Sequence, residues 1–353
     1  MLRAIWKIVA VVAVAGSSLA GARAMQQTAN KSRTDTVVAA AQAFLGTLDA
    51  AKRARANGEL NDKTRTIWSN LPTGMKMQVG ATERNGLKLG DMTPAQEKAA
   101  LALLAATLSP EGFQKTMAIV DADHVLEVRS APSRAPTAAM RFGRAEYYLA
   151  ILGTPSADRM WMLQFGGHHL AINVTLAGSR HVLAPTHTGT QPATYSIEGK
   201  TVRPLGDEND KAFALINALD AAQQKQAILG VEVRNLVLGP GVDGKMIEPE
   251  GVRAATFTPA QRGMLLDLTR EWVGILGTDA ASEKMQEIEK TAGDTYFAWA
   301  GPTTSGKGAY FRIHGPAVFI EYAPQGQGDT NVDHIHTIYR EPGNDYAAKA
   351  APR

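Results

Sequence analysis

Two histidine-containing motifs are the parts of this sequence best suited to chemistry. One is Asp333-His334-Ile335-His336, whose two histidines are separated by a single residue. In a β-strand, residues two apart point to the same face and lie about 7 Å apart at Cα, so these imidazoles can bind one metal ion. The other is Gly166-Gly167-His168-His169, in which two histidines follow a pair of glycines. One histidine of this second motif would supply a third nitrogen ligand.

A site with three histidine ligands keeps one coordination position open for water or a substrate, as catalytic zinc sites do. The sequence therefore predicts a zinc or copper site whose ligands come from a set of four histidines: His168, His169, His334 and His336. Adjacent strand residues point to opposite faces, so only one of His168 and His169 is expected to join, and the sequence leaves open which. Glu321 and Asp333 are the candidate catalytic residues, as a general base or as a hydrogen-bond partner of a ligand.

Two classes of function fit these motifs. The first is a metal-dependent hydrolase or oxidoreductase that acts on a small-molecule substrate, which the sequence does not identify. The second is a non-catalytic binding or structural protein whose histidines form hydrogen bonds within the core. His181 and His187, in a stretch rich in Pro and Thr, are interpreted as loop residues and reserve ligands, and His124 as a residue on a helix surface.

Two further motifs lack a residue that their chemistry requires. Residues 301–307 are similar to a phosphate-binding P-loop, but Gly308 replaces the Ser or Thr that binds Mg²⁺. Residues 329–333 begin like a calcium loop, but His334 replaces the glycine that this loop needs. Nucleotide binding is therefore not expected, and a weak calcium site is left open.

The Gly-His-His motif lies in a segment with the pattern of a β-hairpin. Apolar runs flank Gly166-Gly167 within residues 161–175, which predicts a turn at the two glycines. In this register His168 lies on the apolar face and His169 on the polar face. Residues 310–322 have a similar length around Gly315-Pro316, a pair that favours a two-residue type II′ turn.

Short blocks of sequence recur in the same order in two parts of the chain. Leu48-Asp-Ala-Ala51 recurs as Leu219-Asp-Ala-Ala222, and Thr93-Pro-Ala-Gln96 recurs as Thr258-Pro-Ala-Gln261. These blocks predict an internal duplication, which divides the chain into two repeat units and a connector: residues 35–195, 209–346 and 196–208.

Helices are predicted ahead of the strands in each unit. Thr93-Pro-Ala-Gln96 has the residues of a capping box, with Pro at the first helical position. The helical patterns cover residues 37–55, 93–108, 113–126, 210–229, 258 onward and 281–291. Because helices and strands occur in blocks, the sequence predicts an α+β fold with mainly antiparallel strands, in which the two units pack as a pseudo-symmetric pair.

The first 24 residues have the pattern of a secretory signal peptide. Arg3 and Lys7 accompany an apolar run that is too short to span a bilayer, and Ala22-Arg-Ala24 fits a cleavage site. We therefore expect a periplasmic or secreted protein with no stable membrane span after cleavage. Residues 25–34 and 347–353 are expected to be disordered.

Composition excludes several partners and ligands. The signal segment holds three of the 37 basic residues and no acidic one, so the mature chain has 34 residues of each sign. This balance leaves no basic surface for nucleic acid. The sequence contains no cysteine, which excludes disulfides and thiolate metal ligands.

The histidine motifs also resemble those of a known family. The similar segments are Gly167-His168-His169-Leu170, Pro192-Ala193, and Asp333–Arg340 with Pro342 and Asn344-Asp-Tyr346. From about residue 35 to residue 346 the chain resembles the domain-of-unknown-function family 3500, which occurs in bacterial and fungal proteins. Glu341 and Ala347 stand where that pattern has Asp and Gly. The resemblance implies a common fold and offers no reaction.

Overall fold

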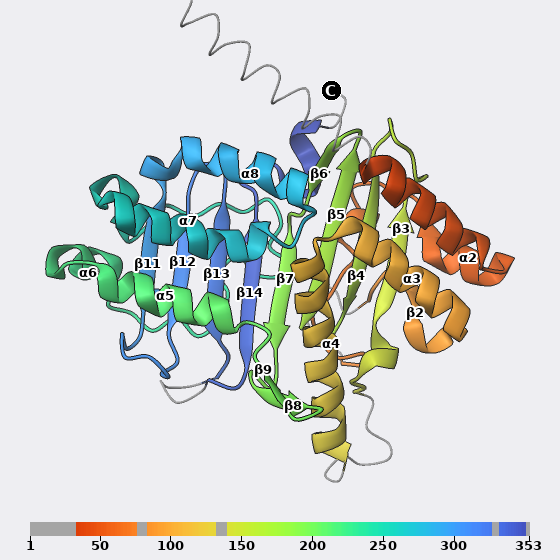
Figure 1. The fold of residues 1–353 in the computed structure, drawn as a ribbon, viewed down its shortest axis with the longest axis horizontal. Helices are drawn as coiled ribbons and strands as arrows, with labels where there is room; N and C mark the ends of the chain where they lie inside the picture. Colours follow the sequence, from red (N-terminus) through yellow and green to blue (C-terminus); the bar gives the residue numbers. More distant parts are fainter. Residues whose placement is uncertain (1–32, 76–82, 132–139, 327–331, 351–353) are drawn as a thin grey trace, which may run out of the picture.

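A mostly antiparallel β-sheet forms the centre of the structure, and helices pack on one of its faces (Figure 1). The computed structural model describes residues 33–75, 83–131, 140–326 and 332–350. One set of strands comprises β1 (Asn57–Gly58), β2 (Leu87–Lys88), β3 (Tyr148–Leu152), β4 (Trp161–Gly167), β5 (Leu170–Ala177), β6 (Arg180–Val182) and β7 (Thr186–Thr190). The other comprises β10 (Val252–Arg253), β11 (Tyr296–Ala300), β12 (Tyr310–His314), β13 (Phe319–Pro324) and β14 (Ile335–Arg340).

The two sets of strands join into one sheet through β7 and β14. The strand order is β1-β3-β4-β5-β7-β14-β13-β12-β11-β10, with β2 beside β3 and β6 beside β5. The pairs are antiparallel, except that β1 runs parallel to β3. The predicted α+β class with mainly antiparallel strands is thereby confirmed. A separate hairpin, β8 (Tyr195–Ile197) and β9 (Lys200–Val202), begins at the last residue of the first predicted unit and extends into the expected connector.

Side-chain caps fix the starts of several helices. Thr93 and Gln96 form the predicted capping box, as do Thr258 and Gln261, and each cap contributes about 1 kcal/mol. The helices cover residues 33–46, α2 (Ala50–Ala56), α3 (Pro94–Thr107), α4 (Pro110–Ser130), α5 (Gly206–Ala218), α6 (Ala221–Ala227), α7 (Pro259–Val273) and α8 (Thr278–Lys290). None of these helices is long and apolar enough to cross a membrane.

Two helices that were expected to be continuous are each divided in two. The helix predicted over 37–55 ends at residue 46, and Asp49 then caps α2 by accepting a hydrogen bond from Lys52 N at 2.9 Å. In the same way, Asp220 caps α6 through the backbone N–H groups of Ala222 and Gln223. The repeated Leu-Asp-Ala-Ala block is therefore a helix start, because its carboxylate binds backbone N–H groups that a new first turn leaves free.

Both predicted hairpin turns differ from their expected form. Gly167 pairs with Leu170, so the β4–β5 turn consists of His168 and His169 rather than of the two glycines. A Cβ on Gly167 would lie 2.8 Å from the Tyr147 ring, which explains the glycine within the strand. In the second hairpin His314 pairs with Phe319 and Gly315 N donates to the Val318 carbonyl at 2.8 Å, so the turn centres on Pro316 and Ala317 rather than on Gly315 and Pro316.

The described residues extend slightly beyond the limits expected from the sequence. The first helix begins at residue 33, and Thr34 is buried. At the other end, Asp345–Ala350 form 3-10 turns interrupted by a kink at Tyr346 and Ala347, and Ala347 is buried. The predicted signal peptide over 1–24, and most of the segments expected to be disordered, lie outside the described residues.

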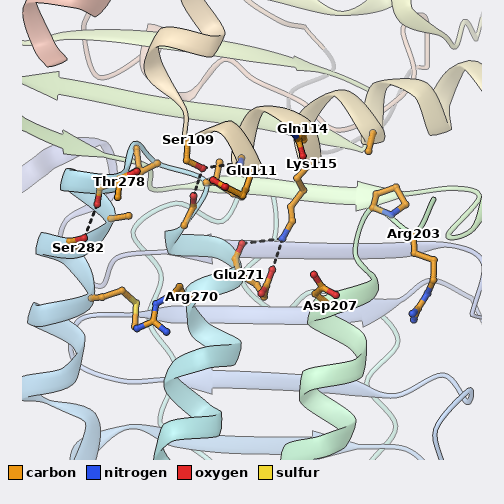
Figure 2. Close-up of a pocket in the computed structure, with 18 of the residues that line it drawn as sticks. Ser109, Glu111, Gln114, Lys115, Arg203, Asp207, Arg270, Glu271, Thr278 and Ser282 are labelled. Atoms are coloured by element: carbon orange, nitrogen blue, oxygen red, sulfur yellow. Dashed lines mark hydrogen bonds and ion pairs between the residues drawn. The ribbon is translucent and has the colours of Figure 1, made fainter. Parts of the chain in front are cut away.

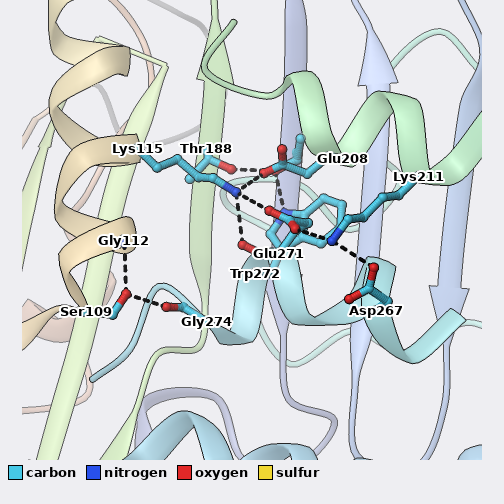
Figure 3. Close-up of polar contacts among 11 residues, drawn as sticks. Ser109, Gly112, Lys115, Thr188, Glu208, Lys211, Asp267, Glu271, Trp272 and Gly274 are labelled. Carbon is cyan, nitrogen blue, oxygen red and sulfur yellow. Dashed lines mark hydrogen bonds and ion pairs between the residues drawn. The ribbon is translucent and has the colours of Figure 1, made fainter. Parts of the chain in front are cut away.

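Charged side chains connect the helices of the two halves (Figure 3). Lys115 of α4 places its Nζ 2.6 Å from Glu208 of α5 and 3.0 Å from Glu271 of α7. Glu271 also binds Lys211, at 2.7 Å, and Lys211 binds Asp267 at 2.9 Å. The Glu208 side chain is 1% exposed, and its burial raises its pKa although Lys115 opposes the rise. Lys115 is therefore the cation that allows a carboxylate to be buried between α4 and α5.

We predict that Lys115→Met lowers the free energy of unfolding by about 3–5 kcal/mol, because the substitution leaves the buried Glu208 without its cation. Urea unfolding at neutral pH measures this loss. Lys98→Met, at an exposed position of α3, is the matched control and should change stability by less than about 0.5 kcal/mol. The double variant Lys115→Met/Glu208→Gln should recover part of the loss, whereas a loss below about 1 kcal/mol in the single variant would contradict this role of Lys115.

Candidate metal centre

Three histidines from opposite parts of the chain meet beside β7. His169 lies in the β4–β5 turn, His334 precedes β14, and His336 lies within β14. Strand β7 pairs with β5 on one side, where Ala171 faces His187, and with β14 on the other, where His336 faces Gly189. The strand β7 therefore brings the turn and the start of β14 to the same end of the sheet (Figure 1).

The ring nitrogens of these histidines converge on one point. His169 Nε2 lies 2.7 Å from His334 Nε2, which lies 3.1 Å from His336 Nε2. One ring nitrogen from each of the three residues lies within 4.8 Å of the others. Ligands on a tetrahedral zinc ion, at ~2.0–2.1 Å from the metal, are about 3.3 Å apart, so small ring rotations would adapt the cluster to an ion.

Hydrogen bonding alone does not account for this convergence. A neutral imidazole nitrogen carries either one proton or one lone pair. His334 Nε2 faces two other ring nitrogens, so a single proton or lone pair cannot form a good bond to both. A metal ion accepts a lone pair from each nitrogen and removes the conflict.

The cluster is kept in the protonation state that binds metals. Burial, followed by the neighbouring imidazoles, lowers the pKa of His169 and of His336 well below the usual value. Burial also lowers the pKa of His334 to about 4. All three rings are therefore neutral at neutral pH, and a neutral imidazole offers its lone pair to a metal without first losing a proton.

His168 lies outside the cluster. Its Nδ1 is 2.6 Å from Asp123 Oδ1 on α4, and its ring lies 5.0 Å from the ring of Phe142, centroid to centroid. The structure thus places His169 with the other two histidines and His168 against α4. This outcome follows from the turn geometry, since the two histidines are the turn residues and no longer belong to opposite faces of a strand.

His187 differs from its interpretation as a loop residue, because it lies in β7 and is fully buried. Its Nδ1 donates to the carbonyl of His169 at 3.1 Å, so its Nε2 accepts from the side-chain amide of Asn70 at 3.2 Å. Burial lowers the pKa of His187 to about 3. Both of its nitrogens are therefore occupied within the protein, and His187 supports the backbone of the candidate ligand His169.

The two candidate catalytic carboxylates occupy different environments. Glu321 in β13 is fully buried and accepts hydrogen bonds from Val237 N at 3.0 Å, Leu238 N at 2.8 Å and the Tyr310 hydroxyl at 2.5 Å. These contacts give Glu321 a role in holding the loop that covers the sheet rather than a role in catalysis. Asp333 is exposed, accepts from Ala193 N at 3.1 Å, and is adjacent to His334. Its charge raises the pKa of His334, against the larger effect of burial.

Gly189 makes the approach of the two strands possible at the site. A Cβ at this position would lie 2.7 Å from the carbonyl oxygen of Ile335, and 3.2 Å from ring atoms of both His187 and His336. The glycine, Asp123 and Asn70 were missed by reasoning from the sequence. Their positions depend on pairing between distant strands, and no local pattern marks them.

A groove of about 990 Å³ lies on the helical side of the sheet, between α4, α7 and α8 (Figure 2). None of the clustered histidines lines it. Its cations already have carboxylate partners: Lys115 binds Glu208 and Glu271, Arg203 binds Asp210 at 2.8 Å, and Arg270 lies 3.6 Å from Asp267. The cations that line the groove are therefore already paired within the protein.

Comparison with known proteins gives a family and no activity. The chain belongs to a family described as proteins of unknown function, DUF3500, whose model matches residues 30–348. This match confirms the resemblance that the histidine motifs indicated. No curated protein matches the chain, and no solved structure does.

We predict that Gly189→Ala weakens both the fold and the metal site. The added methyl group would collide with a backbone oxygen that cannot move without disturbing the β7–β14 pairing, so stability should fall by about 1–3 kcal/mol. Zinc affinity, measured by competition with a chromophoric chelator, should fall at least about tenfold. Gly263→Ala in α7 is the control, because nothing lies within 4 Å of the added Cβ there. If the Gly189→Ala variant has the stability and zinc affinity of the wild type, the close approach of β7 to β14 at this position is not required.

Proposed function

We propose that this protein binds a single divalent transition-metal ion, zinc or copper, through His169, His334 and His336. The observation that carries this proposal is the convergence of three neutral ring nitrogens, with His334 Nε2 at 2.7 Å from one neighbour and 3.1 Å from the other. The three ligands are all imidazoles, which suit zinc and copper better than the hard cations Mg²⁺ and Ca²⁺.

The proposed chemistry is metal-assisted hydrolysis or oxidation of a small molecule. With three protein ligands the ion would keep a position for water or substrate, which it can polarise. Asp333, exposed beside His334, is the remaining candidate for a base or a hydrogen-bond partner at the site. The alternative is a non-catalytic binding or structural protein whose histidines bind one another. The unsatisfied arrangement around His334 argues against that alternative.

We predict that the purified protein contains about one equivalent of zinc or copper. Removal of the metal with a chelator should lower its melting temperature, because the ion binds only the folded chain. His336→Ala should abolish stoichiometric binding, since it removes one of three ligands, while circular dichroism shows a retained fold. His124→Ala, at an exposed position of α4, is the control and should bind metal normally.

Metal content is read by elemental analysis after dialysis against a weak chelator. A wild-type protein that holds no zinc or copper, and takes up neither on addition, would leave the hydrogen-bonded alternative in place. Comparing metal-loaded and stripped protein against hydrolase and oxidase substrates then separates a catalytic site from a site that only binds.

We also propose that the chain arose by an internal duplication and that its halves pack as a pseudo-symmetric pair. The mirrored strand order about β7 and β14 supports this, with β2 to β5 on one side and β10 to β13 on the other. Gly86 and Gly251 support it further, since both have positive φ and both lie against backbone of the neighbouring strand, at Leu149 and Phe297. Where the two halves meet, Thr188 of β7 pairs with Thr337 of β14.

We propose, finally, that the protein is exported and that the mature chain begins near Met25 in the periplasm or outside the cell. The basic start, the short apolar run and the small-x-small sequence before residue 25 support this. N-terminal sequencing of protein from the periplasmic fraction should find a start near residue 25. An intact Met1 on the exported protein would rule out cleavage.

A further inference from the structure

The turn that carries His169 is held by polar contacts from four parts of the chain. The carbonyl of His168 accepts a hydrogen bond from the Tyr147 hydroxyl, and its ring Nδ1 lies 2.6 Å from Asp123. The N–H of His169 donates to the carbonyl of Asn70 at 2.9 Å, and its carbonyl accepts from His187 at 3.1 Å. The turn is thus anchored on both sides of the sheet before any metal is bound.

Asp123 is the anchor on the helical side. It lies in α4, its side chain is 1% exposed, and both of its oxygens are used. Oδ1 binds His168, and Oδ2 accepts from the backbone N–H of Gly143 at 2.8 Å. One buried carboxylate therefore connects α4, the segment at Gly143 and the β4–β5 turn.

The position of His168 is passed on to His169 through a direct ring contact. The two ring centroids are 3.8 Å apart, and the ring planes are inclined by 33°. On its other side the His168 ring meets Phe142, at 5.0 Å between centroids. His169 itself has a φ of 49°, a backbone conformation that residues other than glycine seldom adopt, so its place depends on these neighbours.

The other half of the cluster is held by its backbone, since His336 lies in β14 between β13 and β7 and the carbonyl of His334 accepts from Gln325 N at 2.7 Å. The side-chain hydrogen-bond partners of His334 are His169 and His336, and the residue before it, Asp333, is exposed. His169 lies in a turn rather than in a paired strand, so its place in the cluster depends on the contacts of that turn. A ligand that is already in place loses little conformational freedom on binding, which raises affinity.

We propose that Asp123 is a positioning residue of the metal site, which acts through His168 to hold His169 in the place of a ligand. This inference rests on the proposed function, because it assigns a role toward the metal that the three-histidine cluster would bind. Asp123 does not contact the three ligands in the structure, so its effect on the metal is indirect.

The test uses the full mature chain and Co²⁺ as a probe, because the visible spectrum of bound cobalt reports the ligand geometry. Asp123→Asn should weaken Co²⁺ binding by about 10–100-fold and alter that spectrum, while the near-ultraviolet circular dichroism stays that of a folded protein. Asp121→Asn is the matched control: the same substitution on the same helix, at a partly exposed residue that lies 3.9 Å from Arg144. The control should bind Co²⁺ as the wild type does.

A second variant makes the inference independent of whether Asp123→Asn folds. His168→Gln removes the ring through which Asp123 acts, and should weaken Co²⁺ binding to a similar extent. The double variant should bind Co²⁺ no more weakly than the weaker-binding of the two single variants, because both substitutions break the same chain of contacts. Wild-type affinity in either single variant, or losses that add fully in the double variant, would overturn the role of Asp123. A wild-type protein that binds no Co²⁺ would instead refute the metal site itself, so the two failures are distinguishable.

Discussion

Between β7 and β14, Thr188 stands opposite Thr337 and Gly189 stands opposite His336, and this ladder joins segments that are far apart in the sequence. On the helical face the two threonine hydroxyls lie 2.7 Å apart, and Trp272 donates to Thr337 at 2.9 Å. On the opposite face the rings of His187 and His336 meet, with their centroids 5.0 Å apart. One antiparallel pair therefore joins the two parts of the sheet, connects it to the helices above and assembles the histidine cluster. Histidines that are 165 residues apart, such as His169 and His334, come within 2.7 Å only because this pair forms.

Burial of these histidines has a cost that the rest of the fold must offset. Burying an imidazole is unfavourable unless its nitrogens form hydrogen bonds. Burying a protonated imidazole costs more, and burial accordingly lowers the pKa of His169 and of His336. His187 meets the requirement fully, since the His169 carbonyl and Asn70 occupy its two nitrogens. The cluster around His334 does not, because its Nε2 faces two nitrogens at once. His187 has partners for both ring nitrogens, whereas the nearby cluster around His334 does not. This contrast supports the proposed metal ion as the partner of that cluster.

The sequence predicts elements well where the pattern is local and fails where distant strands meet. The capping boxes at Thr93 and Thr258, and the apolar face of β4, follow from spacing alone. Strand β7 was missed because Thr186-His-Thr-Gly-Thr190 has no apolar alternation: its polar side chains are buried against partners from other strands and loops. The turn was misplaced because Gly166 and Gly167 are required by close contacts within the strand rather than by a turn conformation. Which of the two histidines joins the cluster could not be settled without that turn.

The composition of the candidate ligand set bears on what kind of site a proposed metal ion would occupy. Structural zinc sites are closed by four protein ligands, whereas catalytic sites keep a position for water or substrate. Here one further imidazole, His187, is held away from ligation because its Nε2 already accepts from Asn70 and its Nδ1 donates to the His169 carbonyl. His168 is likewise turned to Asp123. His187 and His168, which would be needed to close the site, are thus committed to contacts that hold the candidate ligands in place. The arrangement favours a proposed metal ion with an exchangeable position at the junction of the two halves, where a ligand bound by the ion would contact residues of both.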